Sequence, residues 1–254
     1  MNKTNLKHCI VSLLGLLLFQ TTQPLWGSEK DNNPKVVKKW ITLGNSITKH
    51  AITPFWWGEW GMAATEKTKD YVHLLNSLLE EKYNTPISFE AVNIAAWERD
   101  FKTFDKESLR HNISGDEDII LIRLGENVPN NEETYFVYKN ELADLVAFLK
   151  GLSPNAFFVI TGNFWTNNRK DVIQKDVADQ YNCIWVPLAQ LDTHENKSTL
   201  ETKVFGDDGV WHTVSEGGKT APGVANHPGD LGMKNIAIAI FNAIKENSDG
   251  YFIQ

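Results

Sequence analysis

Short apolar segments rich in β-branched and aromatic residues alternate with longer, helix-like segments along this chain. The five strand-like segments lie at 40–43, 87–92, 119–124, 156–161 and 183–187. The helix-like segments lie at 68–83, 98–112, 132–152 and 169–181, with a last one at 230–245. Continuous apolar runs are typical of strands buried on both faces, as in parallel sheets. The alternation therefore predicts a doubly wound parallel sheet covered by helices on both faces, with its chemistry at the carboxyl ends of the strands.

Length and charge narrow the class further. The 254 residues are enough for one substantial α/β domain and few for two. The net charge is −7, with 42% hydrophobic and 22% charged residues, and no basic cluster of the kind that nucleic acids require. We therefore expect a single globular domain and no nucleic-acid partner.

The N-terminus has the pattern of a secretory signal. Lys3 and Lys7 precede the apolar run 10–19, which is too short to span a bilayer. We predict a signal peptide at 1–27 and one mature domain at 28–254, exported to the periplasm or the exterior, without stable membrane insertion after signal removal. A buried N-terminal helix is the alternative.

Two polar motifs follow predicted strands. Ser46 stands in a turn just after the first strand, where a rigid neighbour can hold an exposed nucleophile. Asn127 follows the third strand, where its amide can donate to a developing oxyanion without adding charge. Each motif alone is also typical of an ordinary turn.

A histidine motif precedes the last helix. Pro228 restricts the backbone next to His227, and Asp230 is a candidate N-cap of the helix that follows. An imidazole held in this way is suited to act as a general base, since its pKa is near neutrality.

The order of the three motifs resembles that of the SGNH (GDSL-like) hydrolases. They are Gly-Asn-Ser-Ile at 44–47, Gly-Glu-Asn at 125–127 and His-Pro-x-Asp-x-Gly-Met at 227–233, and the resemblance covers roughly residues 40–244. It implies a flavodoxin-like, three-layer α/β/α fold with a five-stranded parallel sheet, and ester hydrolysis without metal or cofactor. It also implies that Ser46 is the nucleophile, that His227 is the base, and that the Ser46 backbone amide and Asn127 are oxyanion donors.

The chain departs from the family pattern around the nucleophile. Asn45 replaces the usual Asp before the serine, which removes a charge at nearly the same size. The second family block lacks its glycine, so the remaining oxyanion donor would be the backbone amide of Trp97 or Glu98. The Glu98 side chain is otherwise a candidate partner of Arg99 or a substrate contact.

The third departure concerns the acid of the triad, because Val224 stands where the family has an Asp three residues before the histidine. Asp208 is a candidate replacement if its loop folds back onto His227. A backbone carbonyl could orient the imidazole instead, leaving a dyad. His212 is a weaker competitor for the base, since it lacks the following proline and helix.

Tryptophans follow several predicted strand ends and predict a binding rim that stacks on sugars or covers an acyl chain. They are Trp56, Trp57, Trp60, Trp97 and Trp165. Packing of these rings within their own loops is the alternative. The long, polar, glycine-rich segment 192–226 is also of a length that is usually functional.

These features predict an exported serine esterase, with a carbohydrate O-acetyl ester as the expected substrate. A lipase or thioesterase for longer acyl chains and a catalytically silent carbohydrate-binding relative remain alternatives. A nucleotide- or flavin-binding protein is disfavoured, because no Gly-x-Gly-x-x-Gly or Walker sequence follows the first strand.

Overall fold

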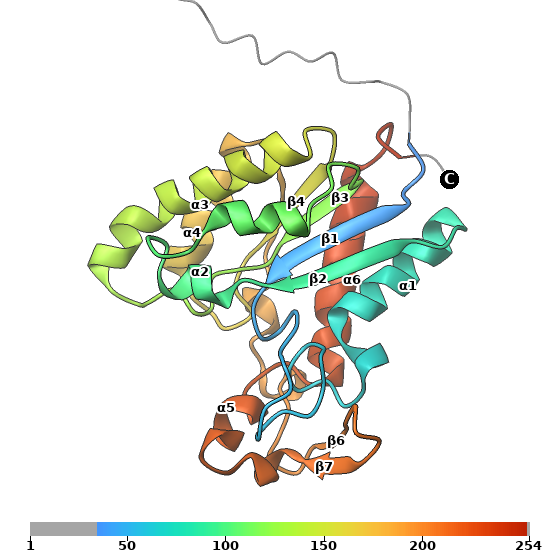
Figure 1. Ribbon diagram of the computed structural model, residues 1–254, viewed down its shortest axis with the longest axis vertical. Coiled ribbons are helices and arrows are strands. Elements are labelled where there is room, and N and C mark those ends of the chain that lie inside the picture. Colours follow the sequence, from blue (N-terminus) through green and yellow to red (C-terminus); the bar gives the residue numbers. More distant parts are fainter. Residues whose placement is uncertain (1–34, 253–254) are drawn as a thin grey trace, which may run out of the picture. The chain divides into compact units, whose positions relative to one another are not determined.

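Five strands form one parallel sheet in the order β2-β1-β3-β4-β5 (Figure 1). They are β1 (Lys39–Gly44), β2 (Ser88–Asn93), β3 (Ile119–Ile122), β4 (Phe157–Thr161) and β5 (Ile184–Val186). The computed structural model describes residues 35–252, so the predicted signal peptide and its cleavage site lie outside the described residues. The predicted five-stranded parallel sheet is confirmed. The chain crosses from β2, on one side of β1, to β3 on the other, which makes the β1/β3 edge the switch point of the sheet.

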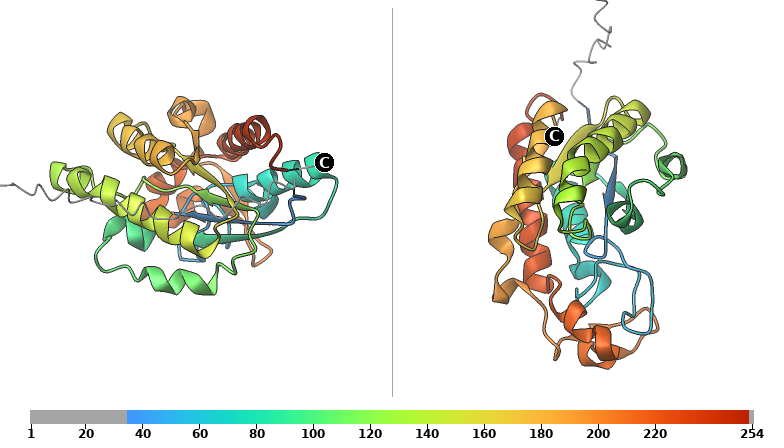
Figure 2. Two further views of the ribbon diagram at one scale, coloured as in Figure 1. Left: turned by 90° about the horizontal axis from the view of Figure 1, so that it is seen from above. Right: turned by 90° about the vertical axis from the view of Figure 1, so that its left-hand side faces the viewer.

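Helices cover both faces of the sheet (Figure 2). One face packs against α1 (Tyr71–Tyr83) and α6 (Asp230–Asn247), and the other against α2 (Ala95–Arg99), α3 (Glu132–Leu152) and α4 (Asn168–Gln180). Alternate residues of each central strand enter the two cores: Ile119 and Leu121 of β3 face one, and Ile120 and Ile122 face the other. The three-layer α/β/α architecture predicted for the chain is thus confirmed.

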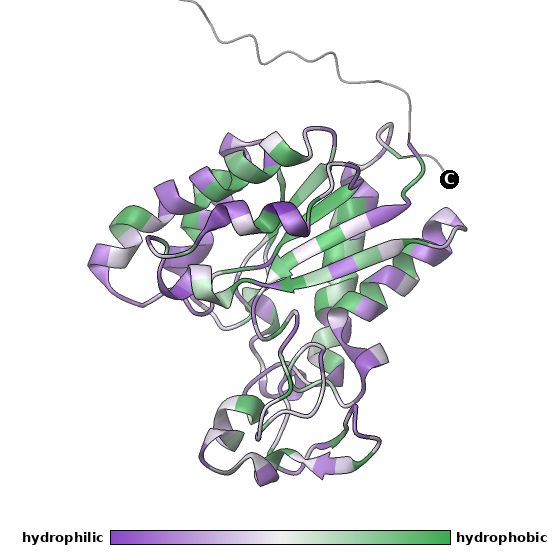
Figure 3. Ribbon diagram, viewed as in Figure 1, coloured by the Kyte–Doolittle hydropathy of each residue, from purple (hydrophilic) through white to green (hydrophobic). Residues whose placement is uncertain are grey.

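Hydropathy follows this layering. The hydrophobic residues gather on the central strands, while each helix has both hydrophobic and hydrophilic residues (Figure 3). All four residues of β3 are buried, whereas β2, at the edge of the sheet, has none fully buried. In residues 35–252, no helix combines the length and apolarity needed to cross a membrane.

The predicted helix at 98–112 is wrong. Helix α2 ends at Arg99, and a separate 3-10 helix occupies Lys106–His111. The Asp100 side chain accepts from Lys102 N at 3.1 Å, and Asp105 caps the 3-10 helix by accepting from Glu107 N at 3.0 Å. Such local bonds compete with helical ones, so two aspartates interrupt a pattern that otherwise favours one helix.

The segment 192–226 is built from small elements. It contains the hairpin β6 (Lys203–Phe205) and β7 (Trp211–Thr213), short 3-10 helices, and α5 (Ala221–Ala225). Asp207 N donates to Trp57 O at 2.8 Å, which ties the hairpin to the loop after β1. The hairpin and α5 lie on the side toward which β1 runs (Figure 1). The segment therefore stands next to the edge where the candidate residues follow their strands.

Candidate active site

The turn after β1 fixes the backbone of Ser46 and leaves its side chain partly exposed. A Cβ atom on Gly44 would lie 1.9 Å from Thr48 Oγ1, so a side chain here would prevent the turn. Thr48 N donates to Asn45 O at 2.9 Å, and Met62 N donates to Ser46 O at 2.8 Å. The Ser46 hydroxyl is thus presented from a rigid support.

The imidazole of His227 lies against this hydroxyl, with Nε2 2.9 Å from Ser46 Oγ. Its other nitrogen, Nδ1, lies 2.8 Å from the carbonyl oxygen of Gly223. Because a carbonyl only accepts, Nδ1 carries the proton and Nε2 presents its lone pair to the serine. Burial lowers the pKa of His227 to about 4, so the imidazole is neutral at physiological pH. This is the form in which a histidine can act as a base.

Neighbouring segments hold the histidine loop in place. The Trp165 ring meets the His227 ring edge-on, with centroids 5.0 Å apart, and Trp165 Nε1 donates to Asn226 O at 3.0 Å. Ser198 N donates to His227 O at 2.9 Å. The loops after β4 and β5 therefore position a residue that lies far from them in sequence.

The expected contact between Asp208 and His227 is not formed. Asp208 Oδ2 lies 2.9 Å from His212 Nε2 on the same hairpin, and Val224 is buried in the core. The prediction of Asp208 as the triad acid is therefore wrong, and Asp208 is instead the partner of His212. His212, the competing candidate for the base, is held by this contact. The Gly223 carbonyl occupies the acid's place, because α5 presents it toward Nδ1. This was the dyad alternative left open by the sequence.

Asn127 and Glu98 meet at the β1/β3 edge. Strand β3 pairs with β1, so the turns that carry Asn127 and Ser46 are neighbours. Asn127 Nδ2 donates to Glu98 Oε2 at 2.6 Å. The backbone amide of Trp97 donates to Ile94 O at 2.9 Å, which removes it as an oxyanion donor. The sequence had suggested the Glu98 backbone amide as an oxyanion donor, or its side chain as a partner of Arg99 or of the substrate. In the structure its carboxylate reaches the site and binds Asn127 instead.

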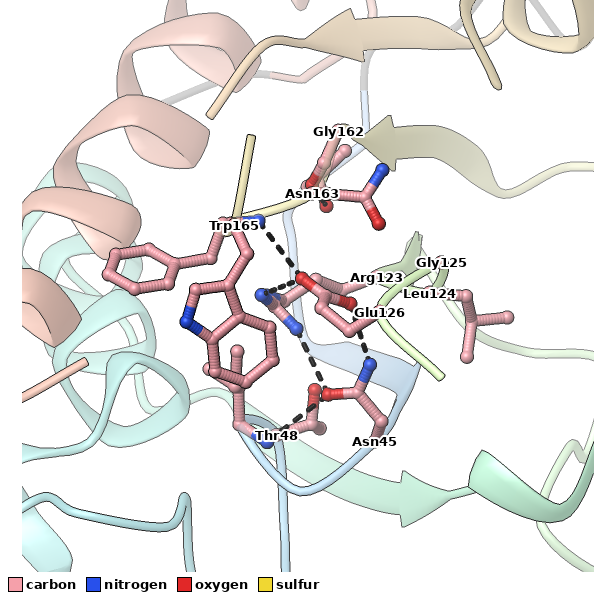
Figure 4. A network of polar contacts seen from close by, with 12 residues as sticks. Asn45, Thr48, Arg123, Leu124, Gly125, Glu126, Gly162, Asn163 and Trp165 are labelled. Atoms are coloured by element: carbon pink, nitrogen blue, oxygen red, sulfur yellow. Dashed lines mark hydrogen bonds and ion pairs between the residues drawn. The ribbon is translucent and has the colours of Figure 1, made fainter. Parts of the chain in front are cut away.

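A buried polar frame, made of Asn45, Glu98, Arg123 and Glu126, lies beneath the nucleophile turn. Asn45, Arg123 and Glu126 are joined to one another, with the Trp165 indole alongside (Figure 4). Sequence reasoning missed Arg123 and Glu126. The available signal was Arg123 itself, the single charged residue in the apolar segment 119–124.

The tryptophan rim is largely a misinterpretation. Trp56, Trp60 and Trp97 are at most 2% exposed, so their faces are covered by protein and cannot stack on a sugar. Trp57 is half-buried and stacks on His212 at 4.4 Å. Trp165 is the predicted tryptophan that is both partly exposed and in contact with His227. The exposed ring of Trp211, on the hairpin, was not predicted.

Comparisons with known proteins agree on the architecture. No family model matches the chain, and no curated protein matches it in sequence. Among solved structures, the salicylyl-acyltransferase SsfX3 from a tetracycline biosynthetic pathway is similar, with a TM-score of 0.52 and 12% identity, over 83% of this chain and 55% of that one. A carbohydrate esterase family 2 enzyme with a carbohydrate-binding domain, from Corynascus thermopiles (Myceliophthora fergusii), has a TM-score of 0.50 and 12% identity, over 85% and 67%. The chain has the three-layer fold of the SGNH hydrolases.

Proposed function

We propose that this protein is a serine esterase in which Ser46 and His227 form a catalytic dyad oriented by the Gly223 carbonyl. The observation that carries the proposal is the 2.9 Å contact between Ser46 Oγ and His227 Nε2, with Nδ1 fixed by a carbonyl 2.8 Å away. A hydroxyl, a neutral imidazole and an orienting acceptor in this order are the parts of an activated nucleophile. The fold and the solved structures similar to it support the same class of reaction.

The proposed mechanism has two stages. Ser46 Oγ attacks the ester carbonyl carbon while its proton moves to His227 Nε2, and the carbonyl oxygen becomes an oxyanion held by the Ser46 amide and by Asn127. The intermediate then releases the alcohol, which takes the proton from Nε2. Water next attacks the acyl-enzyme with His227 as base, which frees the acid and restores the serine.

The proposed substrate is an O-acetyl ester of a carbohydrate. The partly exposed indole of Trp165 beside His227 supports it, because aromatic faces stack on sugar rings. The similar carbohydrate esterase, at 12% identity, points the same way. Because one of the similar structures is an acyltransferase, the test should also include acceptors other than water for the acyl group.

Export is the remaining part of the proposal and rests on the N-terminal sequence alone. Expression of the full-length chain in a secreting host should yield a protein that lacks the predicted signal peptide, 1–27. The intact mass of the secreted protein measures this directly. Retention of the full mass in a cytoplasmic fraction would remove the export proposal and leave the esterase proposal standing.

Hydrolysis of p-nitrophenyl acetate and of acetylated xylan and pectin, by the full chain and by Ser46→Ala, tests the function. We expect acetate release by the wild type and none above background by the variant, with unchanged circular dichroism. A preference for p-nitrophenyl esters of long acyl chains would favour the lipase or thioesterase alternative. No turnover on any ester or acceptor would favour the silent binding relative.

A further inference from the structure

The buried polar frame contains charged groups in an unusual place. Asn45, Glu98 and Arg123 are each 0% exposed, and the Glu126 side chain is 2% exposed. Charges are rarely buried without partners, because water solvates them far better than a protein interior does. Buried ion pairs are also weak sources of stability. Because the charged groups of the frame lie beneath the nucleophile turn, we take their role to be the positioning of that turn and its neighbours.

The Glu98 carboxylate is the central acceptor of the frame. It accepts hydrogen bonds from Asn127 Nδ2 at 2.6 Å, from Asn45 Nδ2 at 3.1 Å and from the backbone amide of Gly125. Asn45 follows β1 and the other two donors follow β3, whereas Glu98 lies on α2, after β2. One carboxylate thus links the carboxyl ends of three strands at the switch point.

Asn45 joins this carboxylate to the nucleophile turn. Its Nδ2 donates to Glu98 and also to Glu126 Oε2, at 2.7 Å. Its Oδ1 accepts from Arg123 Nη1 and from Ile47 N, both at 3.2 Å. Both hydrogens and the oxygen of the amide are therefore engaged, which fixes the side chain immediately before Ser46 in one orientation.

The charges of the frame are unevenly paired. Arg123 forms a 2.6 Å ion pair with Glu126, while no ion pair within residues 35–252 joins Glu98 to a cation. Burial, with the nearby charge of Glu126, raises the pKa of Glu98. The three N–H donors are consequently the groups that stabilise its carboxylate, so loss of any one of them disturbs the other two contacts.

We propose that Glu98 is a positioning residue of the esterase: its carboxylate holds the Asn127 amide at the place where the oxyanion forms and, through Asn45, keeps that amide in register with Ser46. The inference rests on the proposed function, since it gives Asn127 the task of an oxyanion donor.

A purely structural role for Glu98 predicts a different outcome. If Glu98 only stabilised the Gly125 backbone, its replacement would lower stability without a selective effect on the chemical step. As a positioning residue, it acts on kcat more than on KM, because the oxyanion exists only after the substrate is bound.

The test is steady-state kinetics of Glu98→Gln in the full chain, with Glu117→Gln as the matched control. Glu117 is a buried carboxylate at the opposite end of β3, where it accepts from Ser114 and Ser153. A glutamine at position 98 has one acceptor group for donors on both oxygens, so an N–H donor is left facing its NH₂. We expect kcat to fall on the order of tenfold to a hundredfold in Glu98→Gln, with KM within about twofold. We expect Glu117→Gln to keep the wild-type kcat.

A second comparison tests whether Glu98 affects kcat through Asn127. In an Asn127→Ala background, Glu98→Gln should lower kcat by no more than about twofold, because the group that Glu98 positions is already absent. Full additivity of the two losses would overturn the proposal, as would a kcat loss in Glu98→Gln no larger than in Glu117→Gln. Inactivity of the wild type would instead refute the proposed function, so the two failures are distinct.

A measurement on the unmodified chain covers the case in which Glu98→Gln does not fold. The NMR signals of the Asn127 side-chain amide can be assigned by their loss in Asn127→Ala. Because of the 2.6 Å bond to a carboxylate, we expect one of the two protons to be displaced downfield and to exchange slowly with water. Two protons with the shifts and fast exchange of a solvated amide would overturn the proposal.

Discussion

Two histidines of this protein, His212 and His227, differ in their partners and in their positions relative to the sheet. His212 pairs with the carboxylate of Asp208 at 2.9 Å and stacks on Trp57, on an exposed hairpin. His227 has no carboxylate partner among the described residues and is held by the carbonyl of Gly223, against Ser46. A histidine–aspartate pair is therefore not sufficient to mark a catalytic base. What distinguishes His227 is the position of its free nitrogen beside a hydroxyl at the switch point of the sheet.

The sharpest way to break this comparison is to remove each imidazole in turn. We expect His227→Ala to lower kcat by about 10⁴-fold or more, because it removes the proton acceptor for Ser46. His212→Ala should leave kcat within about twofold of the wild type. Hydrolysis of p-nitrophenyl acetate measures both, with circular dichroism as the control for folding. A larger loss of kcat in His212→Ala than in His227→Ala would make His212 the catalytic base and His227 a structural residue.

The buried polar frame beneath Ser46 should be far more sensitive to an added charge than the exposed hairpin that carries His212. In Asn45→Asp, a carboxylate oxygen would take the place of Nδ2, between Glu98 and Glu126. We expect the free energy of unfolding at pH 7 to fall by about 3 kcal/mol, because like charges would face each other without water. Urea unfolding measures the change.

A compensating substitution tests the reason for that loss. In Asn45→Asp combined with Glu126→Gln, the amide and the carboxylate exchange places, so the new NH₂ group at position 126 can donate to the new carboxylate at position 45. The remaining oxygen at position 126 keeps the contacts that Glu126 Oε1 makes with Arg123 and Phe164 N. The double variant should recover part of the lost stability, because the contact with position 126 is restored while the new carboxylate still faces Glu98. A double variant as unstable as the sum of the two single variants would contradict this account.

The acid limb of the pH profile gives a smaller effect that still separates the two histidines. Burial lowers the pKa of His227 to about 4, and only the neutral imidazole accepts the serine proton. The value of kcat/KM should therefore fall as the pH drops through this pKa, and it should still be near its plateau at about pH 5.5. An ordinary histidine, with a pKa near 6.5, would already be about 90% protonated there. A midpoint at about 6.5 would contradict the assigned environment.

The smallest expected effect belongs to Asp208. The hydrogen bond to His212 lowers the pKa of this exposed carboxylate, so its contribution to stability is present at neutral pH and lost as the pH falls through the lowered pKa. Asp208→Asn should lower the melting temperature by no more than about 2 °C and leave kcat unchanged. A loss of kcat comparable to that of His227→Ala would restore Asp208 as the acid.

The sequence predicted the elements that depend on local pattern. Apolar segments of strand composition indicated the sheet, and the positions of Ser46 and Asn127 after two strands that pair placed them at one edge. His227 was found in the same way, from the proline and the helix that follow it. The sheet and its turns follow from periodicity and turn chemistry, which a single sequence contains. The roles of Ser46, Asn127 and His227 came instead from the resemblance of the three motifs, in their order, to those of the SGNH hydrolases.

The sequence did not predict features that depend on tertiary packing. Trp56 and Trp60 pack edge-to-face with centroids 5.7 Å apart, inside a loop that composition alone describes as exposed. The Glu98 carboxylate contacts residues 27 and 53 positions away. The local sequence does not indicate either feature, since the same residues occur in similar segments that are exposed to solvent. The Arg123 charge in the apolar segment 119–124, directly after the buried strand β3, was the one local sign of the frame.

The most direct measurement of the central claim is the labelling of the full chain by a serine-reactive fluorophosphonate, located by peptide mass spectrometry. A dyad formed by Ser46 and His227 predicts one adduct, on Ser46, which is lost in Ser46→Ala, greatly slowed in His227→Ala and unaffected in His212→Ala. No adduct on the folded wild-type protein, or an adduct on a different serine, would contradict the claim that this pair is an activated nucleophile and its base.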